Sequence, residues 1–171
     1  MTVKEAVKQS RSGGIFDNGL IRYAQTRISP EEDLVCAAIV TVNDTKVTSE
    51  EKNSYLLRMG NSYRIRAILC ITTKRMVFYN NILGDDFYID MPFSENPKMD
   101  TGGKMNGIGV SGIRLISREH NCFIVGNKKL MNHLKSGIMA AMMIYQDYFV
   151  NGLKNNANDL LRETQNTDGI E

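Results

Sequence analysis

Apolar residues in this chain gather in short runs of strand length, separated by polar turn residues. The clearest example lies between Ala67 and Phe93, where AILCI, the polar turn TTKR, the run MVFY and the segment FYIDMPF follow one another. Apolar runs of this length, bounded by turn residues, predict strands that pair as an antiparallel meander. By the same pattern we predict strands at Leu34–Val42, Arg64–Thr72, Arg75–Asn80, Phe87–Phe93, Val110–Ser117 and Asn121–Val125.

Helical spacing replaces the strand pattern after Lys128. Apolar side chains then recur along one face of the predicted helix, at Leu130, Leu134, Ile138, Ala141, Tyr145 and Tyr148. This spacing predicts an amphipathic helix from Lys128 to about Val150. A shorter helix is expected at Ile15–Ile28, because Ser29-Pro30 would end it.

The segments between these elements carry weaker signals. Residues 1–14 end in Ser-Gly-Gly, and we expect them to bury little surface, as a frayed end or a loose helix. Asn43–Gly60 is expected to be a long polar excursion. Glu95–Gly109, which is rich in glycine and asparagine, is expected to be a flexible connection. The predicted fold is therefore mainly β, in the α+β class.

Composition limits the kind of protein this is. A length of 171 residues with 42% hydrophobic content suits one domain with its own core. The net charge of +2 creates no field that would gather a polyanion, so we expect no nucleic-acid partner. The three cysteines, Cys36, Cys70 and Cys122, each lie in an apolar run, which predicts buried thiols and a reducing compartment. No apolar run is long enough to span a membrane, and we expect a cytoplasmic protein.

No motif in the sequence assembles a catalytic or cofactor site. The run GIGVSG at Gly107–Gly112 matches the dinucleotide fingerprint, but that site needs a strand before the glycines and a helix after them. Here a loop precedes the glycines and a strand follows. His120, in a predicted turn, and His133, on a predicted helix surface, are too few for a metal site. We therefore expect no metal, no cofactor and no enzymatic activity.

Two segments resemble a known family. The run ILCITTKRMVFYNN, followed by YIDMPFSE, resembles the bacterial pleckstrin-homology (PH) and GRAM families, and GIRLISREHNCFIVGNKKLMNHLKSGI is similar to their final hairpin and capping helix. The resemblance implies a PH-like antiparallel barrel, or two orthogonal sheets, capped by a C-terminal amphipathic helix. We accordingly divide the chain into an N-terminal extension with a short helix at 1–29, the PH-like domain at 30–151 and a polar tail at 152–171.

The resemblance also points to a weak anion site. Lys46, Arg64 and Arg66 are similar to the basic residues on the first strands of phosphoinositide-binding pleckstrin domains. Arg64 and Arg66 would lie on the same face of one strand, and guanidinium groups suit phosphate oxygens. The alternative is that these residues only keep an exposed strand soluble. We interpret the pair Lys74-Arg75 as a solvated hairpin corner, since such turns are polar and exposed.

The face of the C-terminal helix opposite its apolar stripe gives a second hypothesis. Met139, Met142, Met143 and Phe149 would lie there, and Ser136–Gln146 carries no charge. Apolar residues on both sides of a helix indicate a second buried surface. Either a protein partner covers it or the helix at Ile15–Ile28 does. We therefore expect a noncatalytic module for protein contacts or self-association through this helix; the alternative is a peripheral adaptor that binds anionic lipid.

Overall fold

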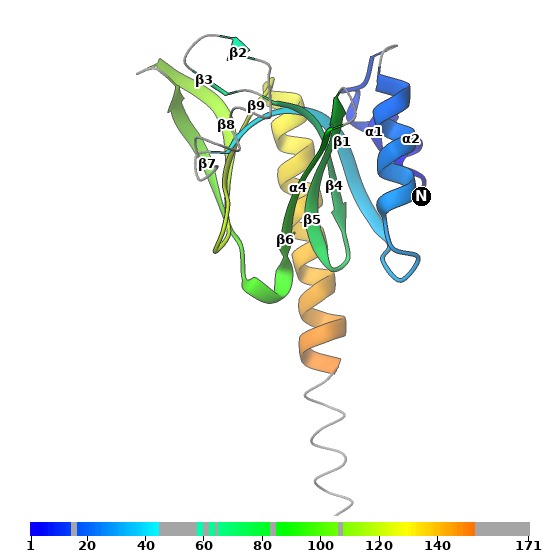
Figure 1. The fold of residues 1–171 in the computed structure, drawn as a ribbon. Helices are drawn as coiled ribbons and strands as arrows, with labels where there is room; N and C mark the ends of the chain where they lie inside the picture. The colour runs from blue at the N-terminus through cyan, green and yellow to red at the C-terminus, as the bar shows by residue number, and fades with distance from the viewer. Residues whose placement is uncertain are drawn as a thin grey trace, which may run out of the picture.

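The main element of the fold is a seven-stranded antiparallel sheet with the strand order β6-β5-β4-β1-β9-β8-β7 (Figure 1). The computed structural model describes residues 1–14, 17–44, 58–59, 62–63, 65–82, 85–105 and 108–152. The strands of the sheet are β1 (Leu34–Asp44), β4 (Ile65–Thr72), β5 (Arg75–Ile82), β6 (Asp85–Pro92), β7 (Lys98–Met105), β8 (Ile108–Ile116) and β9 (Asn121–Val125).

The remaining elements lie around this sheet. They are the helices α1 (Val3–Ser10), α2 (Asn18–Arg27) and α4 (Lys128–Tyr145), the single turn η2 (Phe93–Glu95), the π-helical turn η3 (Gln146–Asn151), and the short strands β2 (Arg58–Met59) and β3 (Ser62–Tyr63). The expected α+β class is therefore confirmed. The predicted strands and both predicted helices are present, with bounds shifted by a few residues.

Both faces of the central strands are buried. Along β1, Cys36, Ala38 and Val40 belong to the core cluster that contains α4, whereas Ala37 and Ile39 belong to the cluster that contains α1 and α2. This division follows from the alternation of side chains along a strand. Figure 1 shows the result, with α4 inside the hollow of the curved sheet and α1 and α2 on its outer side.

One edge of β1 is only partly covered by a strand. β9 pairs with Thr41–Asp44, so among the described strands the first part of β1 is paired with β4 alone. The backbone N–H of Ile39 donates instead to Ser12 Oγ at 2.7 Å, and the hydroxyls of Ser12 and Ser10 are 2.6 Å apart. The segment after α1 therefore satisfies a backbone group of the sheet edge.

The N-terminus is more ordered than the sequence suggested. α1 begins with a capping box: Thr2 Oγ1 accepts from the backbone N–H of Glu5, and a Glu5 carboxylate oxygen accepts from the backbone N–H of Thr2. Val3, Ala6 and Val7 are almost fully buried. The expectation that residues 1–14 bury little surface is therefore wrong, because capping and tertiary packing stabilise a helix too short to stand alone.

The predicted flexible connection at 95–109 is also wrong. β7 occupies Lys98–Met105 and pairs with β8, with a register shift between Thr101 and Gly103. Glycine and asparagine are poor strand formers, but pairing with a neighbouring strand outweighs local preference. The predicted excursion at 43–60 lies mostly outside the described residues.

The position of α4 is set by its N-cap and by a close contact with β1. The N-cap of the helix is Asn127, whose side chain accepts from the backbone N–H of Leu130 at 2.9 Å. Farther along, a Cβ added to Gly137 would lie 2.7 Å from the Cβ of Cys36. Only a glycine therefore lets α4 cross β1 at this distance.

The C-terminal part of α4 leaves the sheet. Leu134, Ile138 and Ala141 are fully buried, and the ring of Tyr145 packs 5.8 Å from that of Phe93. Beyond Tyr145 the helix continues as the π-helical turn η3 and projects past the sheet (Figure 1). Tyr148 is 77% exposed, so its predicted place on the core face is wrong, because the sheet no longer lies beside the helix there.

We predict that Phe78→Ala lowers the free energy of unfolding by about 3–5 kcal/mol, because Phe78 is fully buried in the cluster beneath α4. Chemical denaturation monitored by circular dichroism measures the change. Tyr148→Ala is the control, since it truncates an exposed aromatic ring and should change the value by less than about 0.5 kcal/mol. A loss below about 1 kcal/mol for Phe78→Ala would remove this residue from the core.

Two helical glycines should respond to alanine in opposite directions. Gly137→Ala forces α4 away from Cys36 and is expected to destabilise the protein by about 1–3 kcal/mol. Gly19 of α2 has open space where its Cβ would be, so Gly19→Ala should stabilise by up to about 1 kcal/mol through helix propensity. Thermal unfolding of the two variants compares them, and a stabilised Gly137→Ala protein would contradict the close crossing.

Candidate functional site

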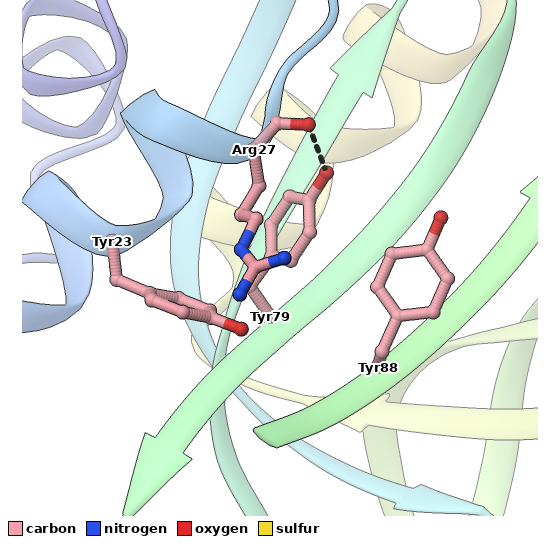
Figure 2. Close-up of a pocket in the computed structure, with 4 residues that line it drawn as sticks. All are labelled: Tyr23, Arg27, Tyr79 and Tyr88. Atoms are coloured by element: carbon pink, nitrogen blue, oxygen red, sulfur yellow. Dashed lines mark hydrogen bonds between the residues drawn. The ribbon is translucent and has the colours of Figure 1, made fainter. Parts of the chain in front are cut away.

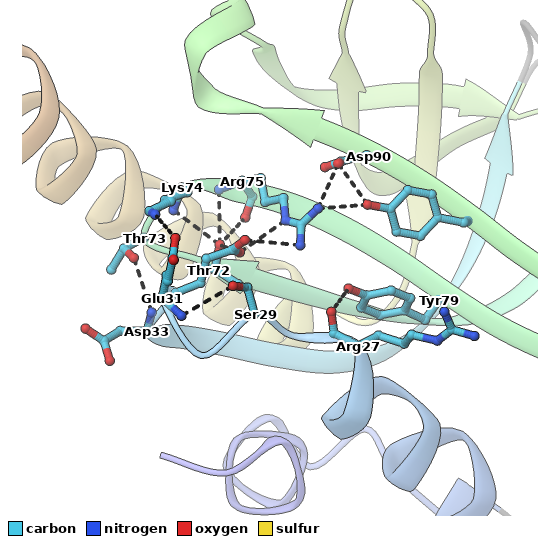
Figure 3. Close-up of polar contacts among 12 residues, drawn as sticks. Arg27, Ser29, Glu31, Asp33, Thr72, Thr73, Lys74, Arg75, Tyr79 and Asp90 are labelled. Carbon is cyan, nitrogen blue, oxygen red and sulfur yellow. Dashed lines mark hydrogen bonds and ion pairs between the residues drawn. The ribbon is translucent and has the colours of Figure 1, made fainter.

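A network of charged side chains lies at the end of the β4–β5 hairpin. The guanidinium of Arg75 donates to Glu32 through Nε at 3.1 Å and to Asp90 through Nη1 at 2.9 Å, and its Nη2 lies 3.1 Å from the second Glu32 oxygen. Figure 3 shows Arg75 directed toward Asp90 across neighbouring strands. The network joins the loop before β1 to β5 and β6.

The hairpin turn is held by Thr72, whose side chain is fully buried. Its hydroxyl oxygen accepts from the backbone N–H groups of Lys74 and Arg75 at 3.2 and 3.1 Å, and the hydroxyl donates to Glu32 at 2.8 Å. Lys74 forms a longer ion pair of 3.6 Å with exposed Glu31. The interpretation of Lys74-Arg75 as a solvated corner is wrong for Arg75, whose side chain is 20% exposed.

The charges in this network are unequal in number. Burial disfavours a charged guanidinium, but the hydrogen bonds to Asp90 and Glu32 outweigh it and raise the pKa of Arg75. One permanent cation therefore faces two carboxylates. Within the described residues, Asp90 Oδ1 is buried without a hydrogen-bond partner, while Oδ2 accepts from Arg75 and Tyr88.

Next to the network is a pocket of about 300 Å³ lined by Tyr23, Arg27, Tyr79 and Tyr88 (Figure 2). Tyr79 and Tyr88 are paired across β5 and β6, with ring centroids 5.6 Å apart, and Tyr23 of α2 meets Tyr79 edge-on at 6.2 Å. The Tyr79 hydroxyl donates to the backbone carbonyl of Arg27 at 3.2 Å. The guanidinium carbon of Arg27 lies 5.1 Å from the centre of the Tyr23 ring.

Tyr88 belongs to both the pocket and the network. Its hydroxyl accepts from Arg75 Nη1 and donates to Asp90 Oδ2, each at 2.8 Å. Burial, followed by the hydrogen bond to Asp90, raises the pKa of Tyr88 to about 12. Burial likewise raises the pKa of Tyr79. Both phenols stay protonated at neutral pH, so the arrangement suits recognition by rings and fixed hydroxyls rather than proton transfer.

The predicted anion site is only partly within the described residues. Lys46 and Arg64 lie outside them. Arg66 forms a two-pronged ion pair with Asp17, from Nε to Oδ1 at 3.0 Å and from Nη2 to Oδ2 at 2.7 Å. The Asp17 side chain is 6% exposed. The guanidinium fork that the hypothesis assigned to phosphate is thus engaged within the chain, tying the segment before α2 to β4.

The four predicted interface residues do not share one environment. Met139 and Met143 are 49% and 66% exposed, as expected for the outer face of α4. Met142 is half-buried against the core, so its predicted place on that face is wrong. The side chain of Phe149 lies outside the described residues.

The helix α2 does not provide the alternative cover for these methionines. It packs on β4 and β5, in the core cluster on the opposite side of the sheet from α4. Nothing in the described part of the chain therefore buries Met139 or Met143.

A thiol and an imidazole also meet, at Cys36 Sγ and His133 Nε2, 3.3 Å apart. Burial raises the pKa of Cys36 to about 11, so its thiol is neutral and unsuited to nucleophilic attack at neutral pH. All three cysteines are buried, as predicted. In the ranges that the structure covers, no group of three or more His, Cys, Asp or Glu side chains is placed to hold a metal ion.

Comparison with known proteins finds one structural similarity to report and no family. No protein-family model matches the chain, and no curated protein matches it. Among solved structures, the chain is similar to the C-terminal domain of an unknown protein from Leishmania infantum, with a TM-score of 0.42 and 13% identity over 76% of this chain and 96% of that one. None of the helices in the described ranges is long and apolar enough to cross a membrane.

The ion pair between Arg66 and Asp17 should make stability depend on pH. Hydrogen bonding to Arg66 lowers the pKa of Asp17 below its ordinary value of 3.8, so the unfolded chain takes up this proton first as pH falls. The pair's contribution should be complete at pH 6–7 and lost as pH falls below about 4. Urea denaturation of wild type and Arg66→Gln across this range measures the difference, which should shrink on acidification. A constant difference would contradict the assignment.

Proposed function

We propose that this chain is a noncatalytic PH-like interaction module that self-associates through the outer face of α4. The curved antiparallel sheet around a C-terminal helix is consistent with the PH-like arrangement. The observation that carries the proposal is the exposure of Met139 and Met143 on a helix that projects past its own sheet.

The chemistry of the described side chains supports a noncatalytic role. Arg75 is engaged by carboxylates, the tyrosine hydroxyls are protonated, and the Cys36 thiol is neutral. Catalysis of proton transfer needs a group whose pKa lies near the working pH. The perturbed groups here are shifted away from neutral pH instead.

A second copy of the chain is the occupant that fits α4 best. The exposed positions Ser136, Met139 and Met143 follow spacings of three and four residues, as in paired helices. This stripe carries no charge, so it does not repel its own copy. Lysines lie in the first half of the helix and Asp147 follows near its end. An antiparallel pair would place these opposite charges, and opposite helix dipoles, side by side.

The expected affinity is modest. Full burial of a methionine side chain is worth about 1.5–3 kcal/mol, and Met139 and Met143 are already partly covered. Four such side chains in a symmetric pair would then give roughly 4–8 kcal/mol before the costs of association. Taken without those costs, this range would correspond to dissociation constants from about millimolar to micromolar. Because the costs reduce the net binding free energy, the methionines alone give weaker binding than this, and other contacts along the helix pair must add to it.

The anionic-lipid function ranks second. Arg66 would have to leave a nearly buried Asp17 to bind phosphate, which leaves a buried carboxylate without its partner. Sedimentation with anionic vesicles at low salt tests this alternative, and wild-type protein that never sediments with them would end it.

We predict that Met139→Glu with Met143→Glu dissociates the oligomer, because each carboxylate would be buried against apolar side chains. Sedimentation equilibrium at high micromolar concentration measures the mass. The matched control is Lys4→Ala with Lys8→Ala, which changes net charge equally at exposed positions of α1 and should leave the mass unchanged. Wild-type protein that is monomeric at this concentration would refute self-association.

A further inference from the structure

The pocket between α2 and the β5–β6 edge is a second surface with its own chemistry. Figure 2 shows Tyr79 between Tyr23 and Tyr88, with the Arg27 guanidinium on the Tyr23 side. Tyr79 is 1% exposed, whereas Tyr88 is 48% exposed. Tyr79 therefore forms a fixed floor, and the Tyr88 ring forms a wall open to solvent. The pocket lies on the opposite side of the sheet from α4.

The polar groups around the pocket favour a cation over an anion. Glu32 and Asp90 together outnumber Arg75, so the adjoining network carries a net negative charge, which the Arg27 guanidinium balances while it occupies the pocket. The Tyr79 hydroxyl donates to a carbonyl and the Tyr88 hydroxyl donates to a carboxylate, which leaves neither hydrogen for an anion. α2 also ends at Arg27, where helix carbonyls concentrate partial negative charge.

A guanidinium group of the chain itself already contacts one of these rings. Arg27 already places its planar guanidinium over the Tyr23 ring, at 5.1 Å from its centre. A guanidinium stacks on aromatic faces and is more weakly hydrated than an ammonium, so it loses less on leaving water. Tyr88 lines the same pocket and is 48% exposed. Its ring can therefore contact a second guanidinium, or replace the Tyr23 ring as the partner of the Arg27 guanidinium.

We propose that this pocket binds the guanidinium of an arginine side chain presented by a protein partner, and that Arg27 competes for it in the free protein. Tyr23, Tyr79 and Tyr88 supply the aromatic faces, and Asp90 with Glu32 supplies the negative potential. The site is independent of self-association through α4.

The test uses N-acetylarginine amide as the probe, with the citrulline analogue as its uncharged isostere. Nuclear magnetic resonance follows the ring protons of Tyr23 and Tyr88 during titration. We expect the arginine probe to shift these signals saturably, with the citrulline probe weaker by about two- to fivefold or more. Arg27→Ala should tighten binding severalfold, whereas Arg22→Ala, an exposed arginine on the same helix, should not.

Variants at Tyr88 distinguish the contribution of its aromatic ring to binding from that of its hydroxyl. Tyr88→Phe should retain arginine binding, and Tyr88→Leu should weaken it by about two- to fivefold, because only leucine removes the aromatic face. The Met139→Glu, Met143→Glu double variant should bind the probe as wild type does. Loss of arginine binding can therefore be distinguished from loss of self-association. Equal affinity for the arginine and citrulline probes would overturn the proposal. So would the absence of a saturable shift with the arginine probe in both the wild-type protein and the Arg27→Ala variant.

Discussion

Burial of β1 on both faces is the constraint on which the rest of the fold depends. The strand joins the β4–β5–β6 meander to the β7–β8–β9 meander, so it lies at the centre of one continuous sheet. Its alternating side chains serve two cores at once, one beneath α4 and one beneath α1 and α2. The run LVCAAIV is accordingly apolar at successive positions, as strands buried on both faces are.

The two cores permit different surfaces on the two sides of the sheet. On the α4 side, the absence of a side chain at Gly137 allows the helix to approach Cys36, and the helix then continues beyond the sheet with methionines exposed. On the other side, α2 ends beside β5, where Arg27 and the tyrosines form a small pocket. Protein contacts at one surface would leave the other accessible, because the sheet separates them.

Local pattern was sufficient to predict the long helix and every strand of the seven-stranded sheet except β7, because side-chain periodicity reports burial directly. The prediction failed at β7, because the composition there favoured a loop whereas pairing with β8 makes it a strand. It also failed at α1, although the sequence contained a signal for this helix, the capping box formed by Thr2 and Glu5. The candidate site was harder to predict. Arg75 was visible as a turn residue, but its partners Glu32 and Asp90 are 43 and 15 residues away in the chain.

The hydrogen bond from Ile39 to Ser12 gives the N-terminal segment a protective role. An unpaired strand edge is a template for strands of other molecules, and evolution usually blocks such edges with charge, proline or a covering element. Here the cover is the segment after α1, which precedes β1 in the chain and can dock only after β1 has formed. Until this segment docks, the N–H of Ile39 is open to a strand of another molecule, so docking of the N-terminal segment also protects the chain against edge-to-edge aggregation.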